Sequence, residues 1–159
     1  WRHQAGAARC RNPNEVSMRN ENFERAVSMI LKRDQRYPRG AYELMPVALD
    51  YTVRQIQERQ RAGDLFDNGA ASRHVTGRQL SEGFRDYMLE EFGPFAYEIL
   101  ADLNIRATID IGNLVYNLIS VGCFGKTPED KLEDFDAVYD FNVAFNEPFE
   151  VQDPSYNAS

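Results

Sequence analysis

The chain contains few residues of the types that most often build metal centres, disulfide frameworks and nucleophilic sites. Its 159 residues include two cysteines, Cys10 and Cys123, and two histidines, His3 and His74. A structural zinc site draws four ligands mainly from these residue types, which the sequence does not bring together, so we expect no metal. Two cysteines so placed are a poor disulfide framework, which favours a reducing compartment such as the cytoplasm. No glycine-rich phosphate loop follows a predicted strand, and we therefore expect no cofactor.

Long apolar runs are also absent. None approaches the roughly 18 residues that span a membrane, and no charged stretch followed by an apolar one opens the chain as a secretion signal would. Apolar residues nevertheless make up 43% of the sequence and aromatic residues 12%, which is enough for a buried core. The length favours a single domain, which buries roughly 70% of the surface that the unfolded chain exposes. We expect no contact with a membrane.

Cations are scarce in the second half of the chain. Residues 1–85 carry 15 Lys or Arg and 10 Asp or Glu, a net charge of +5, whereas residues 86–159 carry 3 and 15, a net charge of −12. An acidic region repels nucleic acid and favours a basic partner. The alternative interpretation is a solvated surface that maintains solubility.

What the sequence does contain is helical periodicity. Apolar residues recur at spacings of three and four over residues 23–33, 39–61, 78–92, 94–103 and 109–121, and a shorter helix is predicted over 128–136. Pro46 either kinks the second of these helices or moves its start to about Met45. The pattern predicts an all-α, compact domain of five to six helices.

Helix-start signals precede three of these segments. Thr76 and Gln79 have the spacing of a capping box. Thr108 is expected to cap the fifth helix, and Thr127 followed by Pro128 to start the sixth.

The pattern changes after about Asp136. Tyr139, Phe141, Val143 and Phe145 alternate with smaller or polar residues, and Phe149 continues the aromatic series. A period of two predicts an extended C-terminal strap with its aromatic side chains in a groove of the helical body. The alternative is a free acidic and aromatic tail that acts as a peptide ligand.

These segments suggest a domain organisation. Residues 1–17 show no periodicity and are expected to be a non-native leader or a flexible arm, with Met18 as the natural start. Residues 18–149 are expected to form the single helical domain, and residues 150–159 a frayed tail.

Several short strings stand in order along the chain. They are Phe23 to Leu31, Arg36-Tyr37-Pro38, Ala48-Leu49-Asp50-Tyr51-Thr52, Arg73-His74-Val75-Thr76-Gly77, Glu91-Phe92-Gly93-Pro94, Ile111-Gly112-Asn113-Leu114-Val115, and Asp140-Phe141 with Ala144-Phe145. Over about residues 21–149 this order resembles a family of conserved hypothetical proteins described from Planctomycetes and Verrucomicrobia. The family has no assigned activity, so the resemblance implies no catalytic residue. Pro46 and Leu103 depart from its pattern, where a helix former and a tryptophan are expected.

One acidic cluster is a candidate partner surface. Glu129, Asp130, Glu133 and Asp134 fall at helical spacings, which predicts that they share one helix face. Calcium loops need acids at alternate positions around a glycine, and that order is absent here. The cluster is either a solvated face or a surface for a partner.

Residues 100–122 have the outline of a helix-turn-helix. Asn113, Tyr116 and Asn117 are the candidate readers of nucleic-acid bases. From Thr108 to Gly125 there is no Lys or Arg to contact phosphates, which favours two packed core helices instead. His74 is expected to pack or hydrogen-bond locally, and Cys123 to be a buried, inert thiol.

No catalytic constellation emerges from these patterns. The sequence therefore favours a non-enzymatic, cytoplasmic interaction or accessory protein that binds another protein, and the acidic second half favours a partner with a basic surface. The alternative is a nucleic-acid-binding regulator that uses residues 100–122. A third reading is an enzyme whose site assembles from scattered carboxylates and tyrosines.

Overall fold

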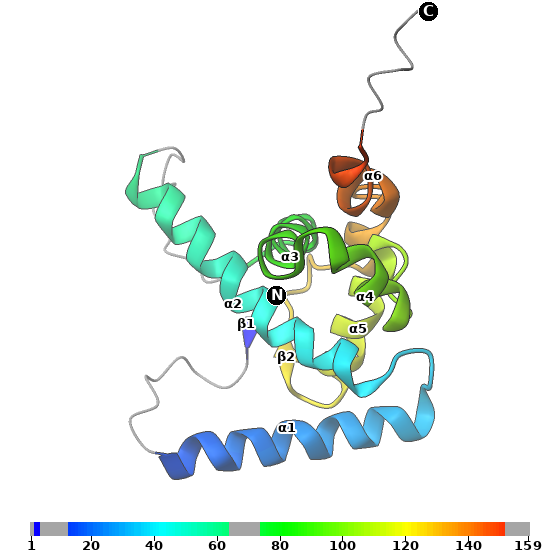
Figure 1. The fold of residues 1–159 in the computed structure, drawn as a ribbon. Coiled ribbons are helices and arrows are strands. Elements are labelled where there is room, and N and C mark those ends of the chain that lie inside the picture. Colours follow the sequence, from blue (N-terminus) through cyan, green and yellow to red (C-terminus); the bar gives the residue numbers. More distant parts are fainter. Residues whose placement is uncertain (1, 4–12, 64–73, 152–159) are drawn as a thin grey trace, which may run out of the picture.

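The chain folds around helices. In this computed structural model the described residues are 2–3, 13–63 and 74–151, with side chains described from residue 19 onward. Within these ranges lie α1 (Pro13–Arg33), α2 (Arg39–Arg61), α3 (Gly77–Phe92), η1 (Gly93–Phe95), α4 (Ala96–Asp102), α5 (Thr108–Ser120), η2 (Leu132–Phe135), α6 (Phe141–Phe145) and η3 (Glu147–Phe149), where η denotes a 3₁₀ helix (Figure 1). Two two-residue strands, β1 (Arg2–His3) and β2 (Phe124–Gly125), pair antiparallel, with His3 opposite Phe124. The all-α prediction is confirmed.

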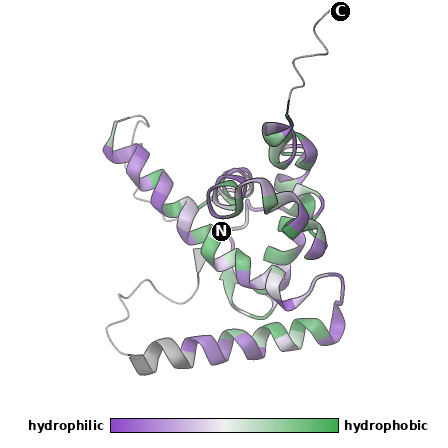
Figure 2. Ribbon diagram, in the orientation of Figure 1, coloured by the Kyte–Doolittle hydropathy of each residue, from purple (hydrophilic) through white to green (hydrophobic). Residues whose placement is uncertain are grey.

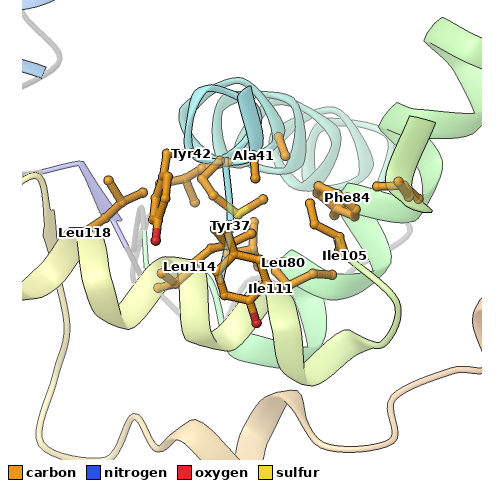
Figure 3. Close-up of a cluster of buried hydrophobic side chains, with 14 of the residues drawn as sticks. Tyr37, Ala41, Tyr42, Leu80, Phe84, Ile105, Ile111, Leu114 and Leu118 are labelled. Atoms are coloured by element: carbon orange, nitrogen blue, oxygen red, sulfur yellow. The ribbon is translucent and has the colours of Figure 1, made fainter. Parts of the chain in front are cut away.

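The core lies where α2 and α3 pack against each other and α5 packs against both. Figure 3 shows Tyr37, Tyr42, Leu80, Phe84, Ile111 and Leu114 converging there from these helices and from the turn before α2. All six side chains are at most 2% exposed. Helix α1 lies along one side of this body, against α2 and α5, while α6 lies on the far side from it (Figure 1). The far end of α2 is mostly hydrophilic (Figure 2), in line with its exposed charged side chains.

Several helix ends follow the predicted chemistry. The Thr76 hydroxyl accepts the Gln79 backbone N–H at 3.1 Å and the Gln79 side chain accepts the Thr76 N–H at 2.9 Å, which confirms the capping box. After α5, Gly122 adopts a φ of 80°, and the Cys123 N–H reaches back to the Leu118 carbonyl at 2.9 Å. This closure needs a left-handed residue, which glycine provides without a steric cost.

The starts of α1 and α2 differ from their predictions. Helix α1 begins at Pro13, ten residues before the periodic segment, so the helix extends into the stretch expected to lack structure. Helix α2 runs from Arg39 through Pro46, so a start near Met45 is wrong. The tail over residues 152–159, Cys10 and the rest of residues 4–12 lie outside the described residues.

The predicted cap of α5 at Thr108 is also wrong. The first turn is capped by the Asp110 carboxylate, which accepts the backbone N–H groups of Arg106 at 2.9 Å and Ala107 at 3.0 Å. The buried Thr108 hydroxyl instead accepts the Val138 N–H at 3.2 Å. A carboxylate at the N-terminal turn of a helix also interacts favourably with the helix dipole.

The helix predicted over 128–136 is reduced to the 3₁₀ helix η2. Asp130 accepts the Thr127 N–H at 2.8 Å and Asp134 accepts the Lys131 N–H at 2.9 Å. Aspartate side chains that satisfy nearby backbone groups in this way compete with a regular helix. The chain therefore forms two successive turns here.

The C-terminal aromatic segment packs on the helical body but is not extended. Asp140 caps α6 by accepting the Val143 N–H at 3.1 Å, and the helix places Phe141 and Phe145 on one side, 6% and 0% exposed. Residues four apart share a helix face, so the alternation that suggested an extended strap is equally compatible with one helical turn. Tyr139 stacks on Phe141 with ring centroids 5.8 Å apart and donates its hydroxyl to the Ser81 carbonyl at 2.8 Å. Docking is thus confirmed for these three rings, whereas Phe149 is 43% exposed.

Candidate functional site

The four acidic residues predicted to share one helix face do not share one. Asp130 is buried, whereas Glu129, Glu133 and Asp134 are exposed. Because residues 128–129 form a turn and η2 is a 3₁₀ helix, spacings of three and four do not align these side chains as an α-helix would. The prediction that they share one helix face is wrong, and a role of these residues in binding a partner stays a prediction.

Asp130 joins two distant parts of the chain. Its carboxylate accepts the Thr127 backbone N–H, and its Oδ1 lies 3.1 Å from Nε2 of His74. Burial raises the pKa of Asp130, but the hydrogen bond from Thr127 and the neighbouring His74 outweigh burial, so the pKa lies below its ordinary value. His74 was expected to pack or hydrogen-bond locally, but its partner Asp130 is 56 residues away in the sequence. The residues around His74 gave no indication of this partner.

A hollow of about 530 Å³ opens beside this pair. Its lining residues are all polar or charged, namely His74, Thr76, Arg78, Thr127, Glu129, Asp130 and Asp134. Small-molecule pockets are lined mainly by apolar side chains. Among the described residues, no three His, Cys, Asp or Glu side chains are grouped as metal ligands would be. Among the described residues, the hollow therefore has neither the apolar lining of a small-molecule pocket nor the grouped side chains of a metal site.

The three candidate base readers make hydrogen bonds within the chain. Asn113 donates to the Tyr37 hydroxyl at 3.1 Å, and Asn117 donates to Tyr42 at 3.1 Å. Tyr116 donates to the Asp130 carbonyl at 3.4 Å. Reading bases with these side chains would require them to leave their partners.

The polar face of α5 forms a network with the turn between α1 and α2. Tyr37 donates to Asp110, and burial together with this bond raises the pKa of Tyr37 above its ordinary value. The Asp34 carboxylate accepts from Arg36 at 2.8 Å and from Asn117 at 2.9 Å. The hydrogen bond from Arg36 holds the pKa of Asp34 well below its ordinary value despite partial burial. These groups stabilise the ionised carboxylate, and their arrangement is that of a structural network.

Cys123 is less buried than expected, and its inertness stays a prediction. The thiol is half-buried, and burial raises its pKa. A nucleophilic cysteine needs a lowered pKa, because the thiolate is the reactive form.

Exposed apolar side chains concentrate at the C-terminal end of the fold. Of the seven large apolar side chains that are exposed in the described part of the chain, five belong to residues 95–151. Phe95 is 67% exposed, Val143 54% and Tyr97 38%. The elements that carry them pack against one another, because α4 contacts both η1 and α6, and α6 contacts η3. Phe95 lies in the segment 94–103, whose apolar spacing predicted a helix with Phe95 on its buried face, but in the structure Phe95 ends η1, before α4 begins.

The same elements contain no cation, and two of them, α4 and η3, contain acidic residues. Residues 86–105 and 132–151 contain no Lys or Arg. Glu98 and Asp102 of α4 and Glu147 of η3 are exposed, as are Glu91 at the end of α3 and Glu150 directly after η3. The η1, α4, α6 and η3 elements, here called the C-terminal face, therefore combine exposed aromatic groups with carboxylates and have no Lys or Arg of their own.

Two further findings bear on this chain. None of its helices, over the part that the structure describes, has the length and apolar character needed to cross a membrane. In comparisons with protein-family models, curated proteins and solved structures, nothing matches this chain.

Proposed function

We propose that this chain is a non-enzymatic accessory protein of the cytoplasm. It binds another, basic protein through its acidic half, residues 86–159. The observation that carries the proposal is the composition of the C-terminal face, where exposed carboxylates occur without a single Lys or Arg on η1, α4, α6 or η3. Such a surface attracts cationic partners and speeds their association. The resemblance to the Planctomycetes and Verrucomicrobia family belongs to the same proposal and adds no activity to it.

The surface chemistry favours a protein over a nucleic acid as the partner. Phosphates are bound by Lys and Arg, which this half of the chain has only at Arg106, Lys126 and Lys131. Protein interfaces are enriched in aromatic residues, and the exposed Phe95, Tyr97 and Phe149 have that character. The amides of α5 that could read bases are bonded inside the fold.

Matched neutralisation of carboxylates tests the proposal. One variant carries E91Q, E98Q, E147Q and E150Q on the acidic half, and a control carries E21Q, E24Q, E43Q and E58Q on α1 and α2. All eight glutamates are exposed, so both variants change the net charge by the same amount without touching the core. Each is immobilised, and proteins retained from an extract of the source cells are compared at about 50 and 300 mM salt.

We expect the unchanged chain and the control variant to retain the same basic protein at low salt, and the acidic-half variant to lose it. Retention of the same protein by both variants would contradict the proposal, because the acidic half would then not matter. Retention of no protein by the unchanged chain would contradict it as well.

A further inference from the structure

Resting on the proposed function, we infer that the C-terminal face is the docking surface and that its occupant is a segment of another protein in which Lys or Arg residues flank apolar side chains. The acidic cluster at residues 129–134 is then not the site. The side chains that would anchor the partner are instead the exposed apolar ones on η1, α4, α6 and η3.

The apolar anchors are not used by the fold. Phe95, Val143 and Phe149 expose 67%, 54% and 43% of their surfaces, although nearby Phe141 and Phe145 are buried. A Phe ring that is left in water forgoes the favourable transfer that burial provides. Aromatic residues on a surface are the residues that most often dominate binding once a partner covers them.

The surface is held in place before any partner arrives. Phe141 and Phe145, on the buried side of α6, make a T-shaped contact with ring centroids 5.1 Å apart, which holds α6 in place. Tyr139 is tied to α3 through the Ser81 carbonyl, and the Val138 N–H is tied to Thr108 of α5. A preorganised surface loses little conformational entropy on binding.

The charges specify the flanks of the occupant. Glu98 and Asp102 lie on α4 together with Tyr97, and Glu147 and Glu150 bracket Phe149. On either side of η1 and α4, Arg85 pairs with Asp86 at 2.8 Å and Arg106 donates to Asn104 at 3.2 Å, and Lys131 lies ten residues before α6. The carboxylates of this face therefore have no Lys or Arg on their own elements, and cations of a partner can supply the missing charge.

A second copy of the chain is a poor occupant. A symmetric dimer through this face would place its carboxylates against the same carboxylates of the other copy. The net charge of −7 adds to that repulsion.

A synthetic peptide of about 18 residues, with leucines on one helical face and lysines on the other, serves as the probe. A control peptide has the same composition in a shuffled order without an apolar face. Fluorescence anisotropy measures the binding of each peptide to the full chain, to an F95S/V143S variant and to an M29S variant. Met29 of α1 is 61% exposed, so M29S removes a similarly accessible apolar side chain from a helix outside the C-terminal face. Circular dichroism checks that all three forms keep their melting midpoint.

We expect the amphipathic peptide to bind the full chain, F95S/V143S to weaken it by about tenfold or more, and M29S to change it by less than about twofold. Equal affinity of all three forms, or no preference for the amphipathic over the shuffled peptide, would overturn the inference. Sedimentation that shows a dimer abolished by F95S/V143S would also overturn it, because a second copy would then be the occupant. If carboxylate neutralisation abolishes retention of a basic protein while F95S/V143S leaves peptide binding intact, the inference fails and the proposed function stands. If neither set of variants has an effect, both fail.

Discussion

Gly83 of α3 lies where α3 passes closest to α2, and replacing it with alanine tests that packing. An added Cβ would lie 1.9 Å from Thr52 Oγ1, 2.7 Å from Thr52 Cβ and 2.9 Å from Thr52 Cγ2. Thr52 is 3% exposed and its hydroxyl donates to the Ala48 carbonyl at 2.7 Å, so it has no free space to enter. The two helices must therefore move apart in Gly83→Ala.

The net effect is a balance of three contributions. Alanine gains about 1 kcal/mol over glycine in a helix. Overpacking a buried contact costs about 1–3 kcal/mol, and loss of the Thr52 hydrogen bond costs about 1 kcal/mol more. We therefore expect the free energy of unfolding to fall by about 1–3 kcal/mol, taking these magnitudes together.

Urea denaturation of three variants measures this balance. Gly40→Ala is the control, because its Cβ would meet only Leu103 Cδ2, at 3.2 Å, and the change should stay within about 1 kcal/mol. Thr52→Ala combined with Gly83→Ala should recover part of the loss, since it removes Oγ1 and Cγ2 but leaves Cβ. A Gly83→Ala protein that is more stable by the full helix-propensity gain would refute the close contact of α2 and α3.

Three other outcomes follow from the contacts described above. Phe145→Ala should lower the free energy of unfolding by roughly 3–5 kcal/mol because the ring is fully buried, and Phe149→Ala by less than about 1 kcal/mol, as urea denaturation can compare. Asp110→Ala should cost about 0.5–2 kcal/mol through loss of the α5 cap, with Asp110→Asn less harmful in thermal melts because the amide oxygen can still accept. The hydrogen bond from Arg36 lowers the pKa of Asp34 in the folded state. The ionised Asp34 therefore contributes its full stabilisation above the ordinary pKa of 3.8, and this stabilisation is lost as the pH falls below that value. Asp34→Asn should accordingly flatten the pH dependence of the free energy of unfolding between about pH 4 and pH 2.

Local chemistry in the sequence was sufficient to predict the regular helices. The Thr76 capping box and the apolar spacing of α3 and α5 depend on residues within one or two turns of each other. Such signals are readable because the interacting groups are close in sequence.

The predictions that failed depended on distant partners. Thr108 does not cap α5 because its hydroxyl serves Val138, 30 residues away. The hydrogen bond between His74 and Asp130 spans 56 residues. Phe95 and Phe149 were expected to be buried, but whether an aromatic side chain meets another element depends on how the helices assemble, which periodicity does not encode. The candidate surface therefore emerged from exposure in the folded chain and from charge, of which only the charge was visible in the sequence.

Site-specific photo-cross-linking tests the central claim most directly. Phe95→benzoylphenylalanine and Met29→benzoylphenylalanine place the same reactive group at side chains that are 67% and 61% exposed, one on the C-terminal face and one on α1. After irradiation of cells that produce the chain, we expect position 95 to yield an adduct with a segment of another protein that contains Lys or Arg and apolar residues, and position 29 to yield none. Adducts at both positions with the same proteins, or at neither position, would contradict the assignment of this face as the binding surface.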